Sequence, residues 1–161
     1  QSISNEDELV TVGQEIEYVR SYLTIQKMRY KDKLEFEIKA DPSITQVPII
    51  RLVLQPIVEN AVHHGAMQRE KGVGKVIVNV KQEEKSTRID VIDNGPGIDY
   101  RIIQSLYGGE KVEHTGIGMM NVQQRLIAIY GNGHGLQIVS SEEGTDVRMN
   151  IPCSVNAGAA Q

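Results

Sequence analysis

The spacing of hydrophobic and polar residues along the chain predicts three helices. Apolar positions recur at intervals of three and four over residues 12–30, 48–65 and 118–130, as on the buried face of a helix. Pro48 suits the first turn of the second helix. Pro56 lies inside the same pattern and removes one backbone donor, so we expect this helix to bend there.

Strands are predicted where apolar and polar residues alternate, or where short apolar runs lie between turn residues. The predicted strands are residues 34–38, 76–80, 88–92, 136–140 and 147–151. Residues 95–115 show little apolar periodicity, and we expect a loop there with one helical turn near Ile102. Strands interleaved with helices predict an α+β fold, a two-layer α/β sandwich whose mixed sheet is covered on one face by helices.

Composition narrows the class of protein. The 161 residues fit one domain at 11–153, between a polar linker at 1–10 and a tail at 154–161 that has nothing to bury and is expected to be disordered. The formal net charge of -4 argues against nucleic-acid binding. Cys153, the only cysteine, excludes an internal disulfide and fits a reducing compartment. The chain has no apolar run long enough to span a membrane, and because it opens on Gln1 we expect a longer natural protein.

The first segment with candidate chemistry is the second predicted helix. Glu59, Asn60, His63 and His64 lie on or beside its polar face, and Asn60 is a helix-surface neighbour of both histidines. An asparagine oxygen is a good ligand for Mg²⁺, which proteins hold with few side chains together with phosphates and water. An ordinary solvated polar face would show the same pattern.

The second segment follows a predicted strand and contains Asp93, Gly95, Gly97 and Ile98. An aspartate at a strand end can accept a hydrogen bond from an exocyclic amine. The glycines let the backbone approach a flat ligand closely. An ordinary Asp-Asn-Gly-Pro turn explains the same residues.

The third segment, with Gly116, Ile117 and Gly118, opens the third predicted helix. Glycine-rich backbone at a helix N-terminus is a ready anion site, because unpaired N–H groups point outward and the helix dipole favours negative charge. Arg125, further along this helix, has either a phosphate or a surface carboxylate as its candidate partner. A flexible loop before a helix is the alternative interpretation.

Together and in this order, the three segments resemble the ATPase superfamily of gyrase, the Hsp90 chaperone, histidine kinases and the mismatch-repair protein MutL. The resemblance implies the Bergerat ATP-binding fold, with ATP and Mg²⁺ as ligands. It assigns Mg²⁺ to Asn60, adenine to Asp93 with Gly95 and Gly97, the end of the ATP lid to Gly116 and Gly118, and a hydroxyl near adenine to Thr145. The further expected nucleotide contacts are His63, His64, Ile98, Ile117 and Arg125.

The motifs are closer still to those of LytS/YehU-type sensor kinases, over about residues 9–152. The matching residues are Glu15, Tyr18, Tyr22, Leu23, Ile25, Gln26 and Arg29, then most of 54–61, then most of 116–126. In that family a membrane sensor and a dimerising helix with the phospho-acceptor histidine precede this domain. The resemblance therefore implies a cytoplasmic protein-histidine kinase domain of a homodimeric membrane protein, which transfers the γ-phosphoryl group of ATP to a histidine on a separate helical domain and then to a response regulator.

Two departures from the family pattern affect the expected chemistry. His63 stands where family members often carry a phosphate-facing lysine, and a histidine is mostly neutral at pH 7. Pro56 stands where gyrase-type members have a water-activating glutamate, which favours phosphoryl transfer over ATP hydrolysis. Glu59 is then a candidate to polarise an incoming imidazole, and Asn60 is the other catalytic candidate. None of the four histidines lies in an acceptor-type Pro-His-Phe motif, so we expect that the chain cannot phosphorylate itself in the usual way.

Other functional classes stay open at this point. A nucleotide-sensing module without kinase activity is favoured by His63. A Ser/Thr kinase of the anti-sigma type would use the same fold, although the long helix over residues 18–29 argues against it. A pure interaction domain would not need both glycine motifs.

Overall fold

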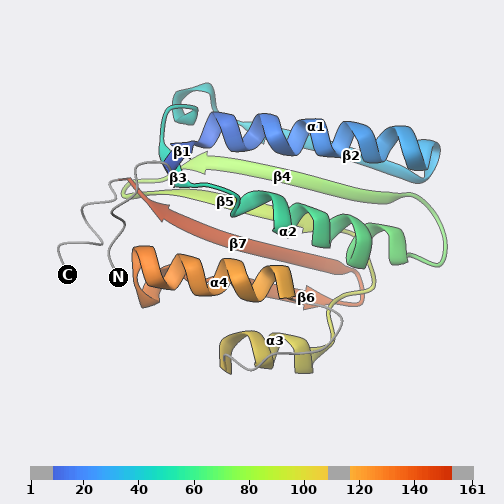
Figure 1. Ribbon diagram of the computed structural model, residues 1–161. Coiled ribbons are helices and arrows are strands. Elements are labelled where there is room, and N and C mark those ends of the chain that lie inside the picture. The colour runs from blue at the N-terminus through green and yellow to red at the C-terminus, as the bar shows by residue number, and fades with distance from the viewer. Residues whose placement is uncertain (1–8, 109–116, 154–161) are drawn as a thin grey trace.

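The computed structural model describes residues 9–108 and 117–153, which are built around a five-stranded sheet (Figure 1). The strands lie in the order β2-β4-β5-β7-β6. β2 pairs parallel with β4, and all other neighbours are antiparallel, so the sheet is mixed as predicted. The strand bounds are β2 Leu34–Ala40, β4 Gly74–Gln82, β5 Ser86–Asp93, β6 Gln137–Ser141 and β7 Gly144–Pro152.

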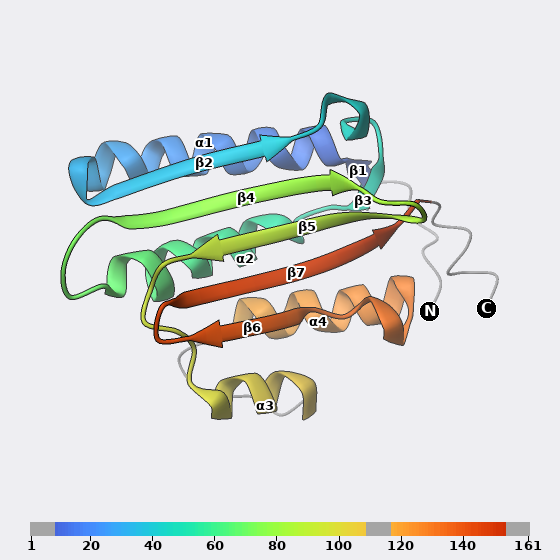
Figure 2. The same cartoon turned by 180° about the vertical axis from the view of Figure 1, so that it is seen from behind.

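Three helices cover one face of this sheet: α1 Val12–Tyr30, α2 Leu54–Asn60 and α4 Ile117–Tyr130. They lie side by side in front of the strands in Figure 1, and the view from behind shows the other face without helices (Figure 2). α3 Tyr100–Gly108 lies beyond the β6 edge. The predicted two-layer α/β sandwich is confirmed.

Short elements complete the chain. β1 Leu9–Thr11 pairs antiparallel with β3 Pro48–Ile50, apart from the main sheet. α2 continues into a π-helical turn, η4, and a 3₁₀ turn, η5. The short helices are η2 Lys31–Lys33, η3 Pro42–Ile44, η4 Ala61–Gly65, η5 Ala66–Gln68 and η6 Asn132–His134.

The core lies between the helices and the inner face of the sheet. In β4, Val76 and Val78 are fully buried, whereas Lys75 and Lys81 are exposed on the outer face, as the period of two in a strand requires. α1 contributes a buried stripe that includes Leu23. Burial of each such aliphatic side chain stabilises the fold by roughly 1.5–3 kcal/mol.

The helix-free face carries charged side chains instead of a second apolar layer. Asp90, only 3% exposed, accepts hydrogen bonds from Arg88 at 2.8 Å and Arg148 at 3.1 Å. Burial and the neighbouring Asp90 carboxylate raise the pKa of Asp146. The two arginines satisfy the buried Asp90 carboxylate here, so this part of the face does not need a covering element.

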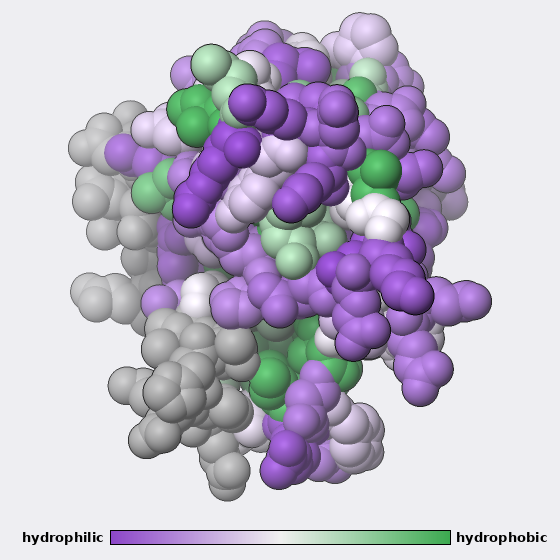
Figure 3. Space-filling view, turned by 90° about the vertical axis from the view of Figure 1, so that its right-hand side faces the viewer, coloured by the Kyte–Doolittle hydropathy of each residue, from purple (hydrophilic) through white to green (hydrophobic). Residues whose placement is uncertain are grey.

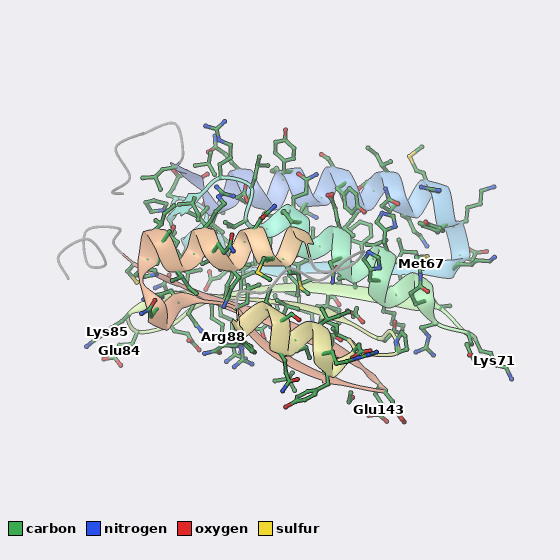
Figure 4. All side chains as sticks on the ribbon, turned by 60° about the horizontal axis from the view of Figure 1, so that its bottom comes forward. Met67, Lys71, Glu84, Lys85, Arg88 and Glu143 are labelled. Carbon is green, nitrogen blue, oxygen red and sulfur yellow. The ribbon has the colours of Figure 1, made fainter. Side chains whose placement is uncertain are left out.

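Figure 4 locates the two ends of the sheet. Met67 and Lys71 lie near the end where β4 begins and β5 finishes, and Glu84 and Lys85 lie in the β4–β5 turn at the opposite end. The carboxyl end of β5 therefore meets the end of the α2 segment. This shared end holds most of the candidate site.

The second predicted helix was placed too early. Pro48 lies in β3, and α2 begins at Leu54. Pro56 is the third residue of α2, in the first turn, where backbone N–H groups have no helical partner to lose. The predicted bend at Pro56 is therefore wrong, and the irregularity comes later, as the π turn over Ala61–Gly65.

The segment after β5 is more helical than predicted. α3 covers Tyr100–Gly108 instead of one turn, since Leu106, a turn after Ile102, is buried and anchors it. The remaining predictions are close, with the first and third helices and all five strands found within three residues of the predicted bounds. The strand β1 begins at Leu9, inside the predicted linker.

Candidate functional site

A pocket of about 210 Å³ lies between α2, α4 and the segment after β5. Figure 3 faces this end of the molecule and shows hydrophobic surface set back among hydrophilic side chains. The lining residues are Asn60, His64, Gln68, Gly97, Ile98, Asp99, Ile102 and Met119. Asn60, His64, Gly97 and Ile98 were predicted from the sequence. Apolar side chains and a few convergent polar groups line this pocket, as in ligand sites, but its volume is below the roughly 300–1,000 Å³ of most such sites.

Asp93 lies beside this pocket as the last residue of β5, with only 8% of its surface exposed. Its Oδ1 accepts a hydrogen bond from Gly95 N–H at 2.8 Å. Burial raises the pKa of Asp93 to about 6, while the backbone N–H groups of Gly95 and Thr145 act in the opposite direction. The folded protein bears the free-energy penalty of burying this carboxylate. When ionised, the carboxylate is a strong hydrogen-bond acceptor.

Glycines allow the end of η4, the turn that continues α2, to approach the end of β5. A Cβ on Gly65 would overlap the Asp93 carboxylate, and a Cβ on Gly95 would overlap the Gly65 carbonyl. Gly97 adopts φ +96° beside the Ser141 carbonyl, which a side chain would obstruct. Gly95 and Gly97 were predicted, but Gly65 had been assigned only as a helix end.

A hydroxyl pair extends the site onto β6 and β7. Thr145 pairs with Asp93 across the β5–β7 ladder, and its Oγ1 lies 2.8 Å from the Ser140 hydroxyl. Ser140 Oγ in turn accepts a hydrogen bond from Ile98 N–H at 2.8 Å. Thr145 was predicted and Ser140 was missed, because a serine in a strand gives no sequence signal of its own.

Asn60 is the last residue of α2 and fits a divalent cation. Its Nδ2 donates to Met119 Sδ at 3.7 Å, and its Oδ1 has no hydrogen-bond partner among the described residues, which leaves the oxygen for a metal. The described parts of the chain contain no group of three or more His, Cys, Asp or Glu able to hold a metal. A cation here would need phosphate or water as further ligands. Met119, which is buried in α4, also lines the pocket.

The two adjacent histidines point to different places. His64 lines the pocket. His63 instead faces α1, where its Nε2 lies 2.9 Å from the hydroxyl of Tyr22. Glu59 is half-buried one turn earlier on the same side, and its charge acts on Tyr22.

Arg125 is not brought to the pocket. Its guanidinium donates to the backbone carbonyls of Leu52, at 3.1 Å, and Arg51, at 2.5 Å. These two residues precede α2, and Leu52 has a φ of +61°. The structure thus gives Arg125 backbone carbonyls as partners, which neither the phosphate nor the carboxylate interpretation anticipated.

The third sequence motif is described only in part. Gly116 lies outside the described residues, as does the side chain of Ile117, whose backbone begins α4. Gly118 is in the first turn, and a Cβ there would meet Pro56 at an ordinary 3.5 Å. The N-terminal turn of α4 therefore lies beside the first turn of α2.

Comparison with known proteins defines the class. The chain belongs to the histidine kinase-, DNA gyrase B- and HSP90-like ATPase family, whose model matches residues 45–155. A histidine kinase family model matches residues 1–34. The sequence resemblance to this superfamily is thereby confirmed.

Individual relatives narrow the comparison. The chain is 35% identical to the sensor histidine kinase YesM of Bacillus subtilis, over 94% of this chain and 25% of that protein. It is also 35% identical to the sensor histidine kinase YpdA of Escherichia coli, over 91% of this chain and 25% of that protein. The chain thus spans about a quarter of the length of these curated relatives.

Solved structures support the fold. The catalytic domain of histidine kinase ThkA matches with a TM-score of 0.60 at 17% identity, over 92% of this chain and 96% of that one. ThkA has also been solved in complex with response regulator protein TrrA.

Within the described residues, no helix combines the length and apolarity required to cross a membrane.

Proposed function

We propose that this chain is the ATP-binding catalytic domain of a two-component sensor histidine kinase. The observation that carries the proposal is the meeting of Asn60, Asp93, Gly97 and Thr145 at one end of the sheet, from three segments far apart in the sequence. The matches to YesM and YpdA support it. The reaction would move the γ-phosphoryl group of ATP to a histidine on a separate helical domain, and from there to a response regulator.

Each of these residues is assigned to a different part of the proposed ligand, ATP with Mg²⁺. Asp93, as a carboxylate, would accept a hydrogen bond from the adenine amine, and the Thr145 hydroxyl lies next to it. Asn60 would offer its Oδ1 to Mg²⁺, which when bound neutralises phosphate charge. His64 lines the same pocket and is a candidate phosphate contact. We keep Gly116, Ile117 and Gly118, at the start of α4, as proposed phosphate contacts through their backbone N–H groups.

Pro56 supports phosphoryl transfer over hydrolysis. It has no group able to orient a water molecule, and it contacts the first turn of α4 near Gly118. Glu59, half-buried nearby, is the proposed group that polarises an incoming imidazole. In such a reaction most of the rate enhancement comes from positioning and charge neutralisation.

The rest of the kinase is proposed from its relatives, which are about four times as long as this chain. We propose an upstream dimerisation and phospho-acceptor domain, a homodimeric state, a response-regulator partner and a membrane-anchored protein with this domain in the cytoplasm. Residues 1–8, before β1, would be the linker and residues 154–161 the tail.

The adenine assignment predicts the effect of Asp93→Ala. Loss of the carboxylate leaves the adenine amine without its acceptor, so we expect ATP affinity to fall at least about 100-fold. Isothermal titration calorimetry of ATP with Mg²⁺ measures this, after a thermal melt has shown that the variant is folded. Near wild-type affinity in a folded Asp93→Ala protein would overturn the assignment.

The metal assignment predicts a different result for Asn60→Ala. We expect this variant to retain the ATP affinity that wild-type protein shows in EDTA, and to gain little when Mg²⁺ is added. The same titration, performed with and without the metal, compares the two proteins. An undiminished response to Mg²⁺ in the variant would remove Asn60 from the metal site.

Phosphoryl transfer can be tested only with a chain that carries an acceptor residue. Mixing this domain with an acceptor-containing segment and radiolabelled ATP should give an acid-labile, base-stable phosphate, as on a histidine nitrogen. An acid-stable phosphate would favour a Ser/Thr kinase. ATP binding without any transfer would favour a nucleotide-sensing module.

A further inference from the structure

Tyr22 of α1 and His63, at the end of the α2 segment, are joined by a side-chain contact across 41 positions of sequence. The Tyr22 hydroxyl lies 2.9 Å from His63 Nε2. The two rings meet edge to face, with centroids 6.4 Å apart and an interplanar angle of 77°. Both residues are half-buried, so the contact is sheltered from water and defines one orientation of the imidazole.

The surroundings keep the Tyr22 hydroxyl protonated. Burial, followed by the negative charge of Glu59, raises the pKa of Tyr22 to about 12, with Tyr30 acting in the same direction and Arg29 against it. A protonated phenol donates readily to the free nitrogen of a neutral imidazole. If Nε2 accepts this bond, the single ring proton is on Nδ1, which becomes a hydrogen-bond donor.

His63 is also held through its backbone, and it is adjacent in sequence to residues that line the pocket. Gln68 Nε2 donates to the His63 carbonyl at 2.9 Å. Asn60 is three residues earlier on the same helical segment, and His64, the next residue, lines the pocket together with Gln68. A neutral imidazole is a short, weak donor, so its usefulness to a phosphate depends on being held in place before the ligand arrives.

We propose that Tyr22 is a positioning residue, whose hydroxyl fixes His63 as the Nδ1–H tautomer and so prepares an imidazole N–H for a phosphate oxygen of the nucleotide. The inference rests on the proposed function, because it presumes ATP as the ligand. It gives α1 an indirect part in phosphate binding, through His63. It also explains how a histidine serves at this position without the permanent charge and reach of a lysine.

The first test examines the protein without nucleotide. Long-range ¹H–¹⁵N correlation spectra of the imidazoles, recorded at a pH where His63 is neutral, report which ring nitrogen carries the proton. We expect Nδ1–H in the wild type and a shift towards Nε2–H, the usual tautomer of free histidine, in Tyr22→Phe. An Nε2–H tautomer in the wild type, or one that Tyr22→Phe leaves unchanged, would overturn the proposal.

The second test is a double-mutant cycle on nucleotide affinity with Tyr22→Phe, His63→Ala and the double variant. We expect Tyr22→Phe to weaken ATP binding about 3- to 10-fold, to leave AMP binding unchanged, and to have no further effect once His63 is alanine. Equal weakening in both backgrounds, or equal weakening for ATP and AMP, would show that Tyr22 acts only through the fold.

Tyr18→Phe is the matched control. Tyr18 lies one turn earlier on α1 with 60% of its surface exposed, and its hydroxyl makes no hydrogen bond within the described residues, so this variant should bind ATP like the wild type. The outcomes also separate two failures. If wild-type protein binds neither ATP nor AMP, the proposed function fails, whereas unaltered ATP binding by Tyr22→Phe defeats only the role of Tyr22.

Discussion

Asp93 shows the free-energy cost of burying the carboxylate that is proposed to bind adenine. It is buried at the end of β5, and burial outweighs the stabilising N–H groups of Gly95 and Thr145. Its pKa is therefore above the value of 3.8 for an exposed aspartate. Because the folded protein holds the proton more tightly than the unfolded chain, this residue lowers stability as the pH rises through about 6.

Asp93→Asn should therefore stabilise the protein at neutral pH. The amide has nearly the same shape and no charge to desolvate, so we expect a gain on the order of 2 kcal/mol at pH 7–8. The gain should shrink as the pH falls from about 6 towards 4, where the wild-type carboxyl is protonated. Urea unfolding of both proteins across this range measures it, and a difference independent of pH would contradict the argument.

At the scale of single residues, the sequence pointed to residues that lie in distinctive motifs. It did not reveal the partners of residues whose role depends on contacts distant in sequence. Asn60, Asp93 and Gly97 follow from residue type and spacing. Arg125 does not, because its acceptors are backbone carbonyls of residues 51 and 52, more than 70 positions away. A guanidinium near a proposed phosphate site looks the same in sequence whether it binds the ligand or a loop.

At the scale of elements, the start of α2 shows a similar limit of sequence-based prediction. The buried carboxylate of Glu15 accepts hydrogen bonds from the N–H groups of Leu52, Val53 and Leu54, at 3.2–3.3 Å. The donors that begin this helix are thus satisfied from α1 and not by a local capping residue. No local pattern could reveal this, which is why the helix was predicted to begin at Pro48.

At the end of η4, which continues α2, one added methyl group should have a large effect. In Gly65→Ala, the new Cβ would overlap the Asp93 carboxylate, so we expect destabilisation of about 2–4 kcal/mol and loss of ATP binding. Thermal melts and calorimetry measure the two effects. Gly133→Ala is the control, since nothing lies within 4 Å of a Cβ there. Equal behaviour of the two variants would contradict the close approach.

At the scale of the whole molecule, the proposed ligand would contact α2, β5, β7 and α4, which span both halves of the sheet. ATP with Mg²⁺ should therefore stabilise the entire domain. At 100 times the dissociation constant we expect about 2.7 kcal/mol, or roughly 5–10 °C in Tm. Thermal melts with and without the nucleotide measure this. The shift should vanish in Asp93→Ala, and a shift that persists would place the nucleotide elsewhere.

The fold class was predictable from the sequence, but the order of the strands was not. Alternation and short apolar runs identified β4, β5 and β7. Alternation carries no information on neighbours, so the parallel pairing of β2 with β4 at the edge was not predicted. It follows from α2, whose apolar stripe must lie on the same face as α1 while the chain crosses back over the sheet.

The crossover from β2 through α2 to β4 also sets the order in which a growing chain can assemble the site. During translation, the Asn60 segment can dock as soon as β4 has emerged from the ribosome, whereas Asp93 gains its second neighbour only when β7 appears, some 50 residues later. The proposed nucleotide could therefore stabilise only a chain that already includes β7. Nascent chains that stall before β7 would receive no protection from cellular ATP.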